Sequence, residues 1–519
     1  MKKIFSIIGL TFMVIGFSAC SDWLDLRPES EIVLDDFWQD ESEVNQVVAA
    51  CYRSLTENGV MERMMTWGEL RSDNVVKGTL QDMPTSMFRL IDGDLSINNE
   101  YAKWGPFYTV INYCNTFLHY APEVVERDAN FTESKFNSLK AEVLTLRALS
   151  YFYLVRTFKE VPWIDAPSIA DNQDYQIPKS SETFVLNKLL EDLTFAERYS
   201  RDQFETELLS KARITKSAVR SLMADIYMWM EDYEAAVAYC DKVMANTDLE
   251  LVEGEEMLYE VFFNKNASES IFELQFERDI KENDLVRANY GSYDRTVGFW
   301  TFPLALVTGN ENFKIFNVQV GTTYESEEDL RRKDFLYSTS VAQDFFSIFK
   351  YVGARRIEME DGSSAYVFGS HVPNWIVYRL SDIILLRAEA LVQLNRLEEA
   401  MEMVNLTYMR SNIEEGTLEL NLDFYNSQGQ MTNLVLRERQ RELMFEGKRW
   451  FDLMRLARRE DSPVSLVGYV VKKYAGGSNN LKLSVMDALY MPIHIDEFNS
   501  NSALEQNPYY EIEDGNITK

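Results

Sequence analysis

The chain has 519 residues, of which 46% are hydrophobic, and its formal net charge is −31. This length and hydrophobic content are enough to form a large buried core. The excess of carboxylates repels nucleic-acid phosphates and anionic membrane surfaces, and the sequence contains no basic cluster that would reverse this repulsion locally. The composition therefore excludes nucleic-acid binding.

The N-terminus has the order of parts of a bacterial lipoprotein signal. Residues 1–3 (MKK) are basic, residues 4–17 are apolar, and residues 17–20 (FSAC) resemble a lipobox, in which small residues precede a cysteine. In such signals residues 1–19 are removed and the cysteine is acylated, so Cys20 is predicted to be a lipid anchor. The alternative is an ordinary secretory signal with an incidental cysteine. No later apolar run has transmembrane length, so we expect a soluble body tethered at its N-terminus.

Most of the remaining chain has the three- and four-residue spacing of apolar residues that is typical of helices. This spacing predicts helices over residues 44–55, 104–121, 139–158, 184–199, 217–244 and 379–410. The last two contain the short breaks MEDY and QLNR, so each is predicted to be a helix–turn–helix. Cys51, Cys114 and Cys240 fall within helical patterns, and we expect buried free thiols rather than disulfides.

Two of these helix pairs have the residue spacing of tetratricopeptide repeats. Small and large residues stand at identical offsets: Ala224, Tyr227, Tyr233 and Ala236 in one pair, and Ala388, Leu391, Leu397 and Ala400 in the other. Small residues at these positions let two antiparallel helices approach closely, while the large ones fill the groove between them. A third copy begins at Ala148 and Tyr151 but departs into a long loop, so the repeats are predicted to be interrupted rather than tandem.

Residues 262–378 have a different character from the repeats. They contain short aromatic and β-branched runs punctuated by Gly and Asn, with little helical period. We predict an irregular insertion with short strands, carried on the helical scaffold. Binding residues tend to lie on loops that a rigid frame holds in place.

The motifs, taken in order, resemble the SusD/RagB family of nutrient-binding outer-membrane lipoproteins of Bacteroidetes. The similarity spans nearly the whole mature chain and rests on CSDWLDLRPES, YTVINYCNTFL, EVLTLRALSYFYLVRTFKEVPWI, VYRLSDIILLRAEAL, LRERQRELMFEGKRWFDLMR, YMPIHIDEFNSN and QNPYY. The Asn of the second motif resembles one that caps or crosslinks loops in the family. One departure is His494, where the family often has proline.

The resemblance implies a mainly α fold, with interrupted tetratricopeptide-like helix pairs and an irregular, strand-containing insertion. It implies a single SusD-like domain over residues 20–519, made of a helical scaffold (36–260 and 375–460), the insertion (about 262–378) and a C-terminal segment (461–519).

The motif RELMFEGKRWFDLMR concentrates charges in a way that resembles an active site. Its charged residues alternate in sign at three- and four-residue offsets, so they can pair along a helix: Arg441, Glu442, Glu446, Arg449, Asp452 and Arg455. Arginine is always charged and presents bidentate donors, which suits crosslinks between helices. We interpret the motif as structural.

No catalytic or metal-binding motif stands out. The three histidines, His119, His371 and His494, lie beside no nucleophile motif, and neither phosphate-binding nor metal-binding spacings occur. Because a glycosidase needs only two carboxylates, the 83 acidic residues leave that alternative open. We expect a binding protein that is not an enzyme and has no cofactor.

Two stretches combine aromatic and polar side chains in the way that sugar binding requires, with rings for C–H faces and polar groups for hydroxyls. WGELRSDNVVKG and ANYGSYDRTVGFW lie in regions that form the site in SusD-like glycan binders. The candidate ligand-binding residues are Arg71, Asp73, Asn74, Lys77, Asn289, Tyr290, Tyr293, Arg295, Phe299 and Trp300. The alternative is that Trp67, Phe299 and Trp300 belong to the core.

The resemblance implies a surface-exposed lid over a SusC-like TonB-dependent transporter, which captures an oligosaccharide and is held to the outer membrane by its lipid. Asp22 and Asp25, close to Cys20, resemble a surface-export signal. Three alternatives stay open: a peptide-capturing RagB-type protein of the same fold, a glycoside hydrolase, and a structural tetratricopeptide adaptor.

Overall fold

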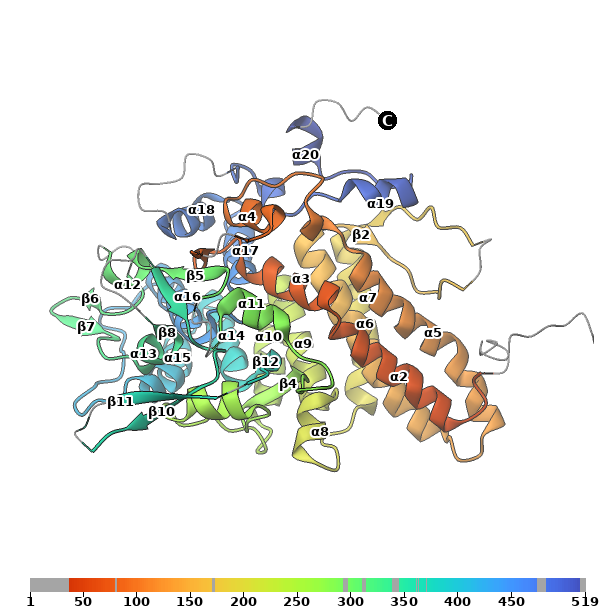
Figure 1. The fold of residues 1–519 in the computed structure, drawn as a ribbon, viewed down its shortest axis with the longest axis horizontal. Helices are drawn as coiled ribbons and strands as arrows, with labels where there is room; N and C mark the ends of the chain where they lie inside the picture. Colours follow the sequence, from red (N-terminus) through yellow and green to blue (C-terminus); the bar gives the residue numbers. More distant parts are fainter. Residues whose placement is uncertain are drawn as a thin grey trace, which may run out of the picture.

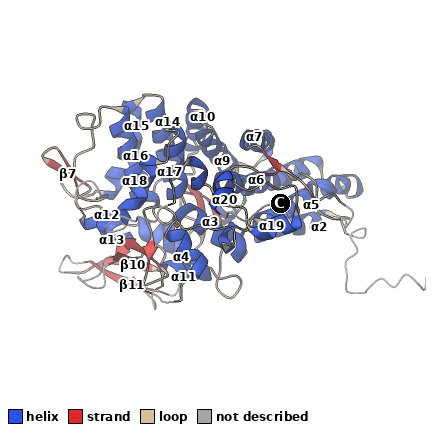
Figure 2. Ribbon diagram, turned by 90° about the horizontal axis from the view of Figure 1, so that it is seen from above, coloured by secondary structure: helices blue, strands red, loops and turns tan. Residues whose placement is uncertain are grey.

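The computed structural model describes residues 37–79, 82–169, 173–292, 297–309, 314–337, 345–360, 362, 364–369, 371–473 and 482–513. Cys20 and the predicted signal lie outside this range. The described part is mainly α-helical with short strands (Figures 1 and 2), as the sequence predicts. No helix in it is both long enough and apolar enough to cross a membrane.

Several helices of the N-terminal part begin at a residue whose side chain caps the helix. The Asp40 carboxylate accepts hydrogen bonds from the N–H groups of Ser42 and Glu43, and the hydroxyls of Thr132 and Ser181 cap two later helices. The elements are α2 (Glu41–Leu55), α3 (Asn58–Glu69), β1 (Val76–Lys77), α4 (Thr85–Ile91), η1 (Glu100–Ala102), α5 (Gly105–Arg127), α6 (Glu133–Phe158), β2 (Val161–Pro162), β3 (Lys179–Ser180), α7 (Glu182–Tyr199) and α8 (Glu207–Ala212).

Asn115 on α5 ties this part together, as the resemblance implies. Its Nδ2 donates to the carbonyls of Ile164 (2.9 Å) and Ala166 (3.3 Å), and its Oδ1 accepts from Arg147 Nη1 (2.9 Å). The residue therefore holds the loop after α6 against both long helices.

The two predicted repeats are helix hairpins. The first is α9 (Lys216–Trp229) with α10 (Tyr233–Met244), and the second is α14 (Leu380–Gln393) with α15 (Leu397–Ser411). Their small positions are completely buried: Ala224, Ala236, Ala388 and Ala400. Glu231 and Asn395, at equivalent places in the two turns, have φ of 62° and 58°, so the repeat extends to the backbone conformation. Helix α10 also packs on α14, which stacks the pairs.

The insertion begins and ends on one strand pair. Antiparallel β4 (Ser270–Leu274) and β12 (Trp375–Arg379) place Leu274 opposite Trp375, so the two ends of the insertion meet on the helical frame. Between them lie α11 (Asp284–Tyr290), β5 (Trp300–Pro303), α12 (Ala305–Thr308), β6 (Val318–Val320), β7 (Thr323–Glu325), α13 (Leu330–Phe335), β8 (Leu336–Tyr337), β9 (Phe345–Ile348), β10 (Ala354–Glu358) and β11 (Ser364–Phe368), and a π-helix, η2 (Leu258–Asn264), precedes β4.

The last helices of the C-terminal part run along the top of the molecule in the view of Figure 1. This part comprises α16 (Gln428–Leu443), α17 (Arg449–Arg459), α18 (Val464–Val470), η3 (Val471–Lys473), η4 (Met486–Leu489), α19 (Ile495–Ser500) and α20 (Pro508–Glu513). The turn between α16 and α17 lies directly on α3: a Cβ added to Gly68 would stand 1.8 Å from the Gly447 carbonyl oxygen. Gly68 therefore permits this contact.

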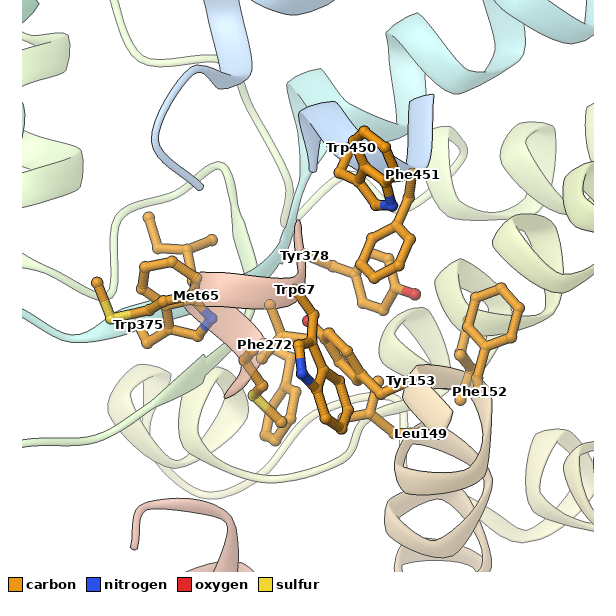
Figure 3. Close-up of a cluster of buried hydrophobic side chains, with 14 of the residues drawn as sticks. Met65, Trp67, Leu149, Phe152, Tyr153, Phe272, Trp375, Tyr378, Trp450 and Phe451 are labelled. Atoms are coloured by element: carbon orange, nitrogen blue, oxygen red, sulfur yellow. The ribbon is translucent and has the colours of Figure 1, made fainter. Parts of the chain in front are cut away.

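The buried apolar residues form one continuous cluster that joins these parts (Figure 3). Trp67 of α3 stacks on Phe107 of α5, with ring centroids 5.1 Å apart, and Tyr153 of α6 meets Phe451 of α17 edge to face. Cys51, Cys114 and Cys240 are buried free thiols, as predicted.

Candidate ligand-binding site

The two stretches predicted to bind ligand lie side by side. Strand β1 pairs antiparallel with β5, with Val76 opposite Thr301 and Lys77 opposite Trp300. The Gly78 N–H extends the pairing by donating to the Phe299 carbonyl at 2.7 Å. A Cβ at Gly78 would stand 2.7 Å from the Gly298 carbonyl oxygen, so this approach needs glycine. Segments more than 200 positions apart thus form one surface.

Arg71 and Asp73 do not reach that surface. The Arg71 guanidinium donates to the carbonyls of Leu489 (2.6 Å) and Ala488 (2.8 Å), and burial lowers its pKa to about 10. Burial by itself would raise the pKa of Asp73, but bidentate hydrogen bonds from Arg449 (2.8 and 2.9 Å) hold it below its usual value. Both side chains join the β1 segment to the C-terminal part.

Four further candidates are also buried in this structure: Asn74, Asn289, Tyr290 and Trp300. Asn74 donates to Glu69 Oε1 (2.7 Å), and the Tyr290 hydroxyl donates to the Phe445 carbonyl (2.8 Å). These side chains lie beneath the surface in this structure, and their direct contact with ligand stays a prediction. Trp67 is likewise in the core.

Within the described residues, the accessible candidates are Lys77, which lies beside Phe88, and Phe299. Lys77 is exposed, Phe299 is partly exposed, and the Lys77 Nζ lies 4.9 Å from the centre of the Phe88 ring. Phe88 is 37% exposed because α4 turns Met87, Leu90 and Ile91 inward and Phe88 outward. The sequence prediction missed Phe88, although the helical spacing of its apolar neighbours marks it as outward-facing. Tyr293 and Arg295 lie outside the described residues.

The charged motif of α16 and α17 is structural, as predicted, but its partners differ from those expected. Only Arg441–Glu438 and Arg455–Asp452 pair along a helix. The other ion pairs cross between elements and are almost completely buried, including Glu442 with Arg331, Arg379 and Arg410, Glu446 with Arg379 and Lys350, Arg441 with Glu325, and Arg449 with Asp73.

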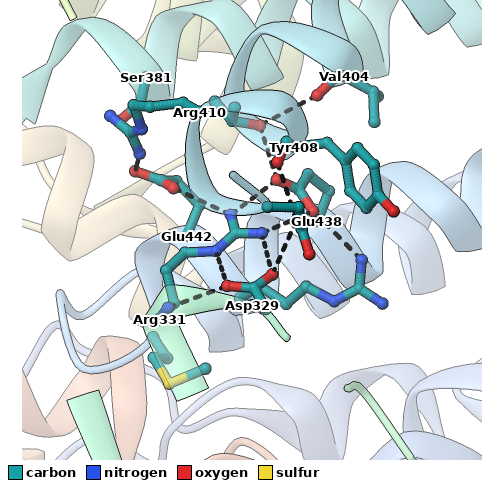
Figure 4. A network of polar contacts seen from close by, with 12 residues as sticks. Asp329, Arg331, Ser381, Val404, Tyr408, Arg410, Glu438 and Glu442 are labelled. Atoms are coloured by element: carbon teal, nitrogen blue, oxygen red, sulfur yellow. Dashed lines mark hydrogen bonds and ion pairs between the residues drawn. The ribbon is translucent and has the colours of Figure 1, made fainter. Parts of the chain in front are cut away.

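Figure 4 shows how these pairs join the insertion to the helices: Arg331 of α13 lies between Asp329 and the α16 residues Glu438 and Glu442, at 2.7–3.0 Å. Burial by itself would raise the pKa of Glu442, but its arginine partners hold it well below the usual value. A carboxylate kept ionised in this way does not donate a proton, so it is unsuited to general acid catalysis.

Two of the histidines have structural contacts in the described part of the chain. His494 accepts a hydrogen bond from the Asp496 N–H at the start of α19, and its φ of −65° is one that proline also adopts. His371 stacks on Phe263, and burial lowers its pKa to about 4. Within the described residues, no group of three or more His, Cys, Asp or Glu side chains is placed to hold a metal ion.

The frame of helix pairs carries an irregular insertion with accessible aromatic and basic side chains. This arrangement is typical of a binding protein. Two family models match the chain: "SusD family" over residues 314–510 and "Starch-binding associating with outer membrane" over residues 22–228. The chain belongs to the SusD family. Members of this family are nutrient-binding proteins associated with the outer membrane, and they are known as binding proteins rather than enzymes.

Curated relatives agree with this assignment, and solved structures share the fold. SusD-like protein P38 of Formosa agariphila is 25% identical over 98% of this chain and 100% of its own, and SusD-like protein P2 of the same organism is 24% identical over 86% and 90%. A SusD superfamily protein from Bacteroides thetaiotaomicron superposes with a TM-score of 0.69 at 21% identity, covering 91% of this chain and 99% of its own. NanU of Bacteroides fragilis gives 0.68 at 20% identity, covering 93% and 100%.

Proposed function

We propose that the protein is a cell-surface lipoprotein that captures an oligosaccharide and delivers it to a SusC-like TonB-dependent transporter. The observation that carries the proposal is the pairing of β1 with β5 in a SusD-family chain, because it brings Lys77, which lies over the exposed Phe88 ring, and the partly exposed Phe299 onto adjacent segments. Anchoring through Cys20 would hold this surface at the outer membrane.

The chemistry of the surface suits a sugar. Aromatic rings cover the C–H faces of a pyranose, and an ammonium group donates hydrogen bonds to its hydroxyls. The buried residues beneath make the surface rigid, so little ordering is needed on binding. A small, open surface of this kind supports micromolar to millimolar affinity.

A peptide-capturing protein of the RagB type is the second candidate, since the same fold and the same aromatic surface would accept a peptide. A glycoside hydrolase is the enzymatic alternative, because many carboxylates lie on the surface. For either, the structure offers no observation as specific as the paired segments.

The test is calorimetric titration of the full mature chain with a panel of oligosaccharides and peptides. We expect saturable binding of an oligosaccharide, weakened about fivefold or more by Phe88→Ala or Phe299→Ala, since stacking contributes about 1 kcal/mol or more per ring. Tyr113→Ala is the matched control: Tyr113 is an exposed aromatic residue on α5 (42%) and should leave affinity unchanged. Saturable binding of peptides without oligosaccharides would reverse the choice of ligand.

Two further measurements separate the alternatives. Product analysis after long incubation should show the bound oligosaccharide intact; cleavage that is lost on one carboxylate-to-amide change would identify a hydrolase. Copurification with a β-barrel transporter from the native membrane is expected for the delivery role. Tyr290→Ala and Trp300→Ala are unsuitable as binding variants, because both side chains are completely buried.

A further inference from the structure

A polar cleft of about 750 Å³ lies behind the β1 segment, among α12, α16, α17 and α18. Four cationic residues from separate stretches of the chain line it: Lys314, Arg437, Arg459 and Lys472. The acidic residues of the lining are Asp73 and Glu460. The fold thus assembles a basic cluster that the sequence does not show, in a protein whose formal net charge is −31.

The two acidic residues that line the cleft are engaged by another residue or by solvent. Asp73 is held by Arg449 at 2.8 Å, while Glu460 is exposed to solvent. Arg459 is only 10% exposed; its Nη1 donates to Glu389 at 2.7 Å, and its Nη2 has no hydrogen-bond partner among the described residues. The Nη2 atom itself is inaccessible, but Glu389 also pairs with Arg455 at 2.6 Å, so it neutralises Arg459 only in part and an anion in the cleft would improve the charge balance.

Lys472 is the second cation with unused capacity. No carboxylate in the described part of the chain lies within ion-pair distance of it, and its Nζ stands 4.4 Å from the centre of the Tyr469 ring. Burial lowers its pKa, Asp73 opposes this change, and Arg449 and Arg437 add to it. Lys472 therefore lies near other positive charges, and a bound anion would reduce the repulsion between them.

We propose that this cleft binds the carboxylate or sulfate group of an acidic oligosaccharide, with Lys472 and Arg459 as the anion-binding residues. The saccharide class rests on the function proposed above, whereas the anionic group rests on the cleft alone. The volume lies within the range of small-molecule sites, which is about 300–1,000 Å³. Gln393, Gln428 and Asn433 line the same cleft and present amides suited to sugar hydroxyls.

The net negative charge of the whole chain does not oppose this binding at contact. At physiological ionic strength exposed charges are screened over about 8 Å, so carboxylates on distant faces act weakly on a ligand in the cleft. Cations that are partly buried beside the ligand are screened much less. The charges that line the cleft therefore determine whether an anion binds there.

The experiment uses the full mature chain and four probes: trigalacturonate, a sulfated carrageenan oligosaccharide, maltotriose as the neutral sugar of matched length, and inorganic sulfate. We expect an acidic oligosaccharide to bind at least about tenfold more tightly than maltotriose, and Lys472→Met to remove about tenfold of this affinity. Lys140→Met is the matched control, because Lys140 also lies over aromatic rings, with no ion pair among the described residues, but on the distant helix α6.

A second variant blocks the cleft without removing a charge. Gly468 on α18 lines it, and a Cβ added there meets nothing within 4 Å, so Gly468→Trp should fold and should abolish binding of the acidic probe. Unfolding midpoints of all variants confirm that they fold.

The outcomes separate the two proposals. Binding of neither acidic oligosaccharide nor sulfate up to about 10 mM overturns the cleft site, as does acidic-probe affinity that Lys472→Met and Gly468→Trp leave unchanged. Maltotriose binding that is insensitive to both variants, without any acidic preference, supports the proposed function but overturns the cleft. Sulfate binding that Lys472→Met removes, with no saccharide bound, supports the anion site and overturns the saccharide function.

Discussion

At the scale of single residues, Glu69 combines complete burial with three N–H donors and no ion-pair partner among the described residues. It accepts hydrogen bonds from Asn74 Nδ2 and from the backbone N–H groups of Phe445 and Gly447. Burial outweighs these bonds and raises its pKa from 4.5 to about 7. Because the folded pKa is the higher one, the stability linked to Glu69 is complete below pH 4.5 and is lost as the pH rises through 7.

Glu69→Gln removes this titration. We expect the difference in unfolding free energy between the native protein and the variant to fall by about 3 kcal/mol from acidic to slightly alkaline pH. Urea unfolding at a series of pH values measures it. A difference that is constant across pH would show that Glu69 titrates at its ordinary pKa.

Arg379 illustrates the cost of a broken buried network. Its guanidinium bonds to Glu269, Glu442 and Glu446, and all four side chains are at most 1% exposed. Arg379→Met leaves carboxylates under-compensated in the interior, so we expect a loss of about 3–5 kcal/mol in unfolding free energy. The control is Arg387→Met, which removes a pair with the solvent-exposed Asp241 and should cost about 1 kcal/mol or less. Equal losses in the two variants would contradict this account.

That the two predicted stretches meet agrees with the sequence prediction, but the orientation of their side chains could not be predicted. Arg71, Asp73 and Asn74 follow α3 in an irregular segment, and no period indicates which of them face inward. Arg449, which binds Asp73, and Gln440, which binds Asp73 and Asn74, lie in the C-terminal part, more than 350 positions away. Only the folded chain shows that Lys77 is the residue of this stretch that remains exposed.

At the scale of elements, the helices follow from local spacing and the strand pairs do not. The predicted helix over residues 184–199 is α7, Glu182–Tyr199, and the two predicted helix–turn–helix segments are the two repeat hairpins. The β1–β5 pair instead joins positions 225 apart, as Val76 and Thr301 show. Two- to four-residue strands carry too little pattern to identify such partners from sequence.

The close approach within a repeat hairpin can be tested on one helix, α10. Ala236 is completely buried against α9, whereas Ala238 faces solvent. We expect Ala236→Leu to lower the unfolding free energy by about 1–3 kcal/mol through overpacking. Ala238→Leu should stay within about 0.5 kcal/mol of the native value. Thermal and urea unfolding measure both, and an unaffected Ala236→Leu would mean that the hairpin has spare room.

At the scale of the whole molecule, the N-terminal signal predicts where the protein resides. Cys20→Ser removes the acylated residue, so we expect the protein to move from the membrane fraction to the soluble fraction, with loss of the acyl mass by mass spectrometry. Cys240→Ala, which changes a buried thiol of the body, should remain membrane-bound. Membrane retention of the Cys20→Ser protein with an unchanged mass would contradict the lipid anchor.

The strand pair β4–β12 has a consequence for how this architecture diversifies. The insertion leaves and rejoins the helical frame at one place. An insertion of another length or shape can therefore replace it without moving the helices. The insertion is nevertheless matched to the helical frame by buried ion pairs. Glu325, Arg331 and Lys350 each pair with a residue of α16 or of the turn that follows it. A transplanted insertion that lacks these three side chains would leave the charged residues of α16 and its turn unpaired in the interior. An insertion grafted from a relative should therefore be tolerated only when it carries equivalent charged residues.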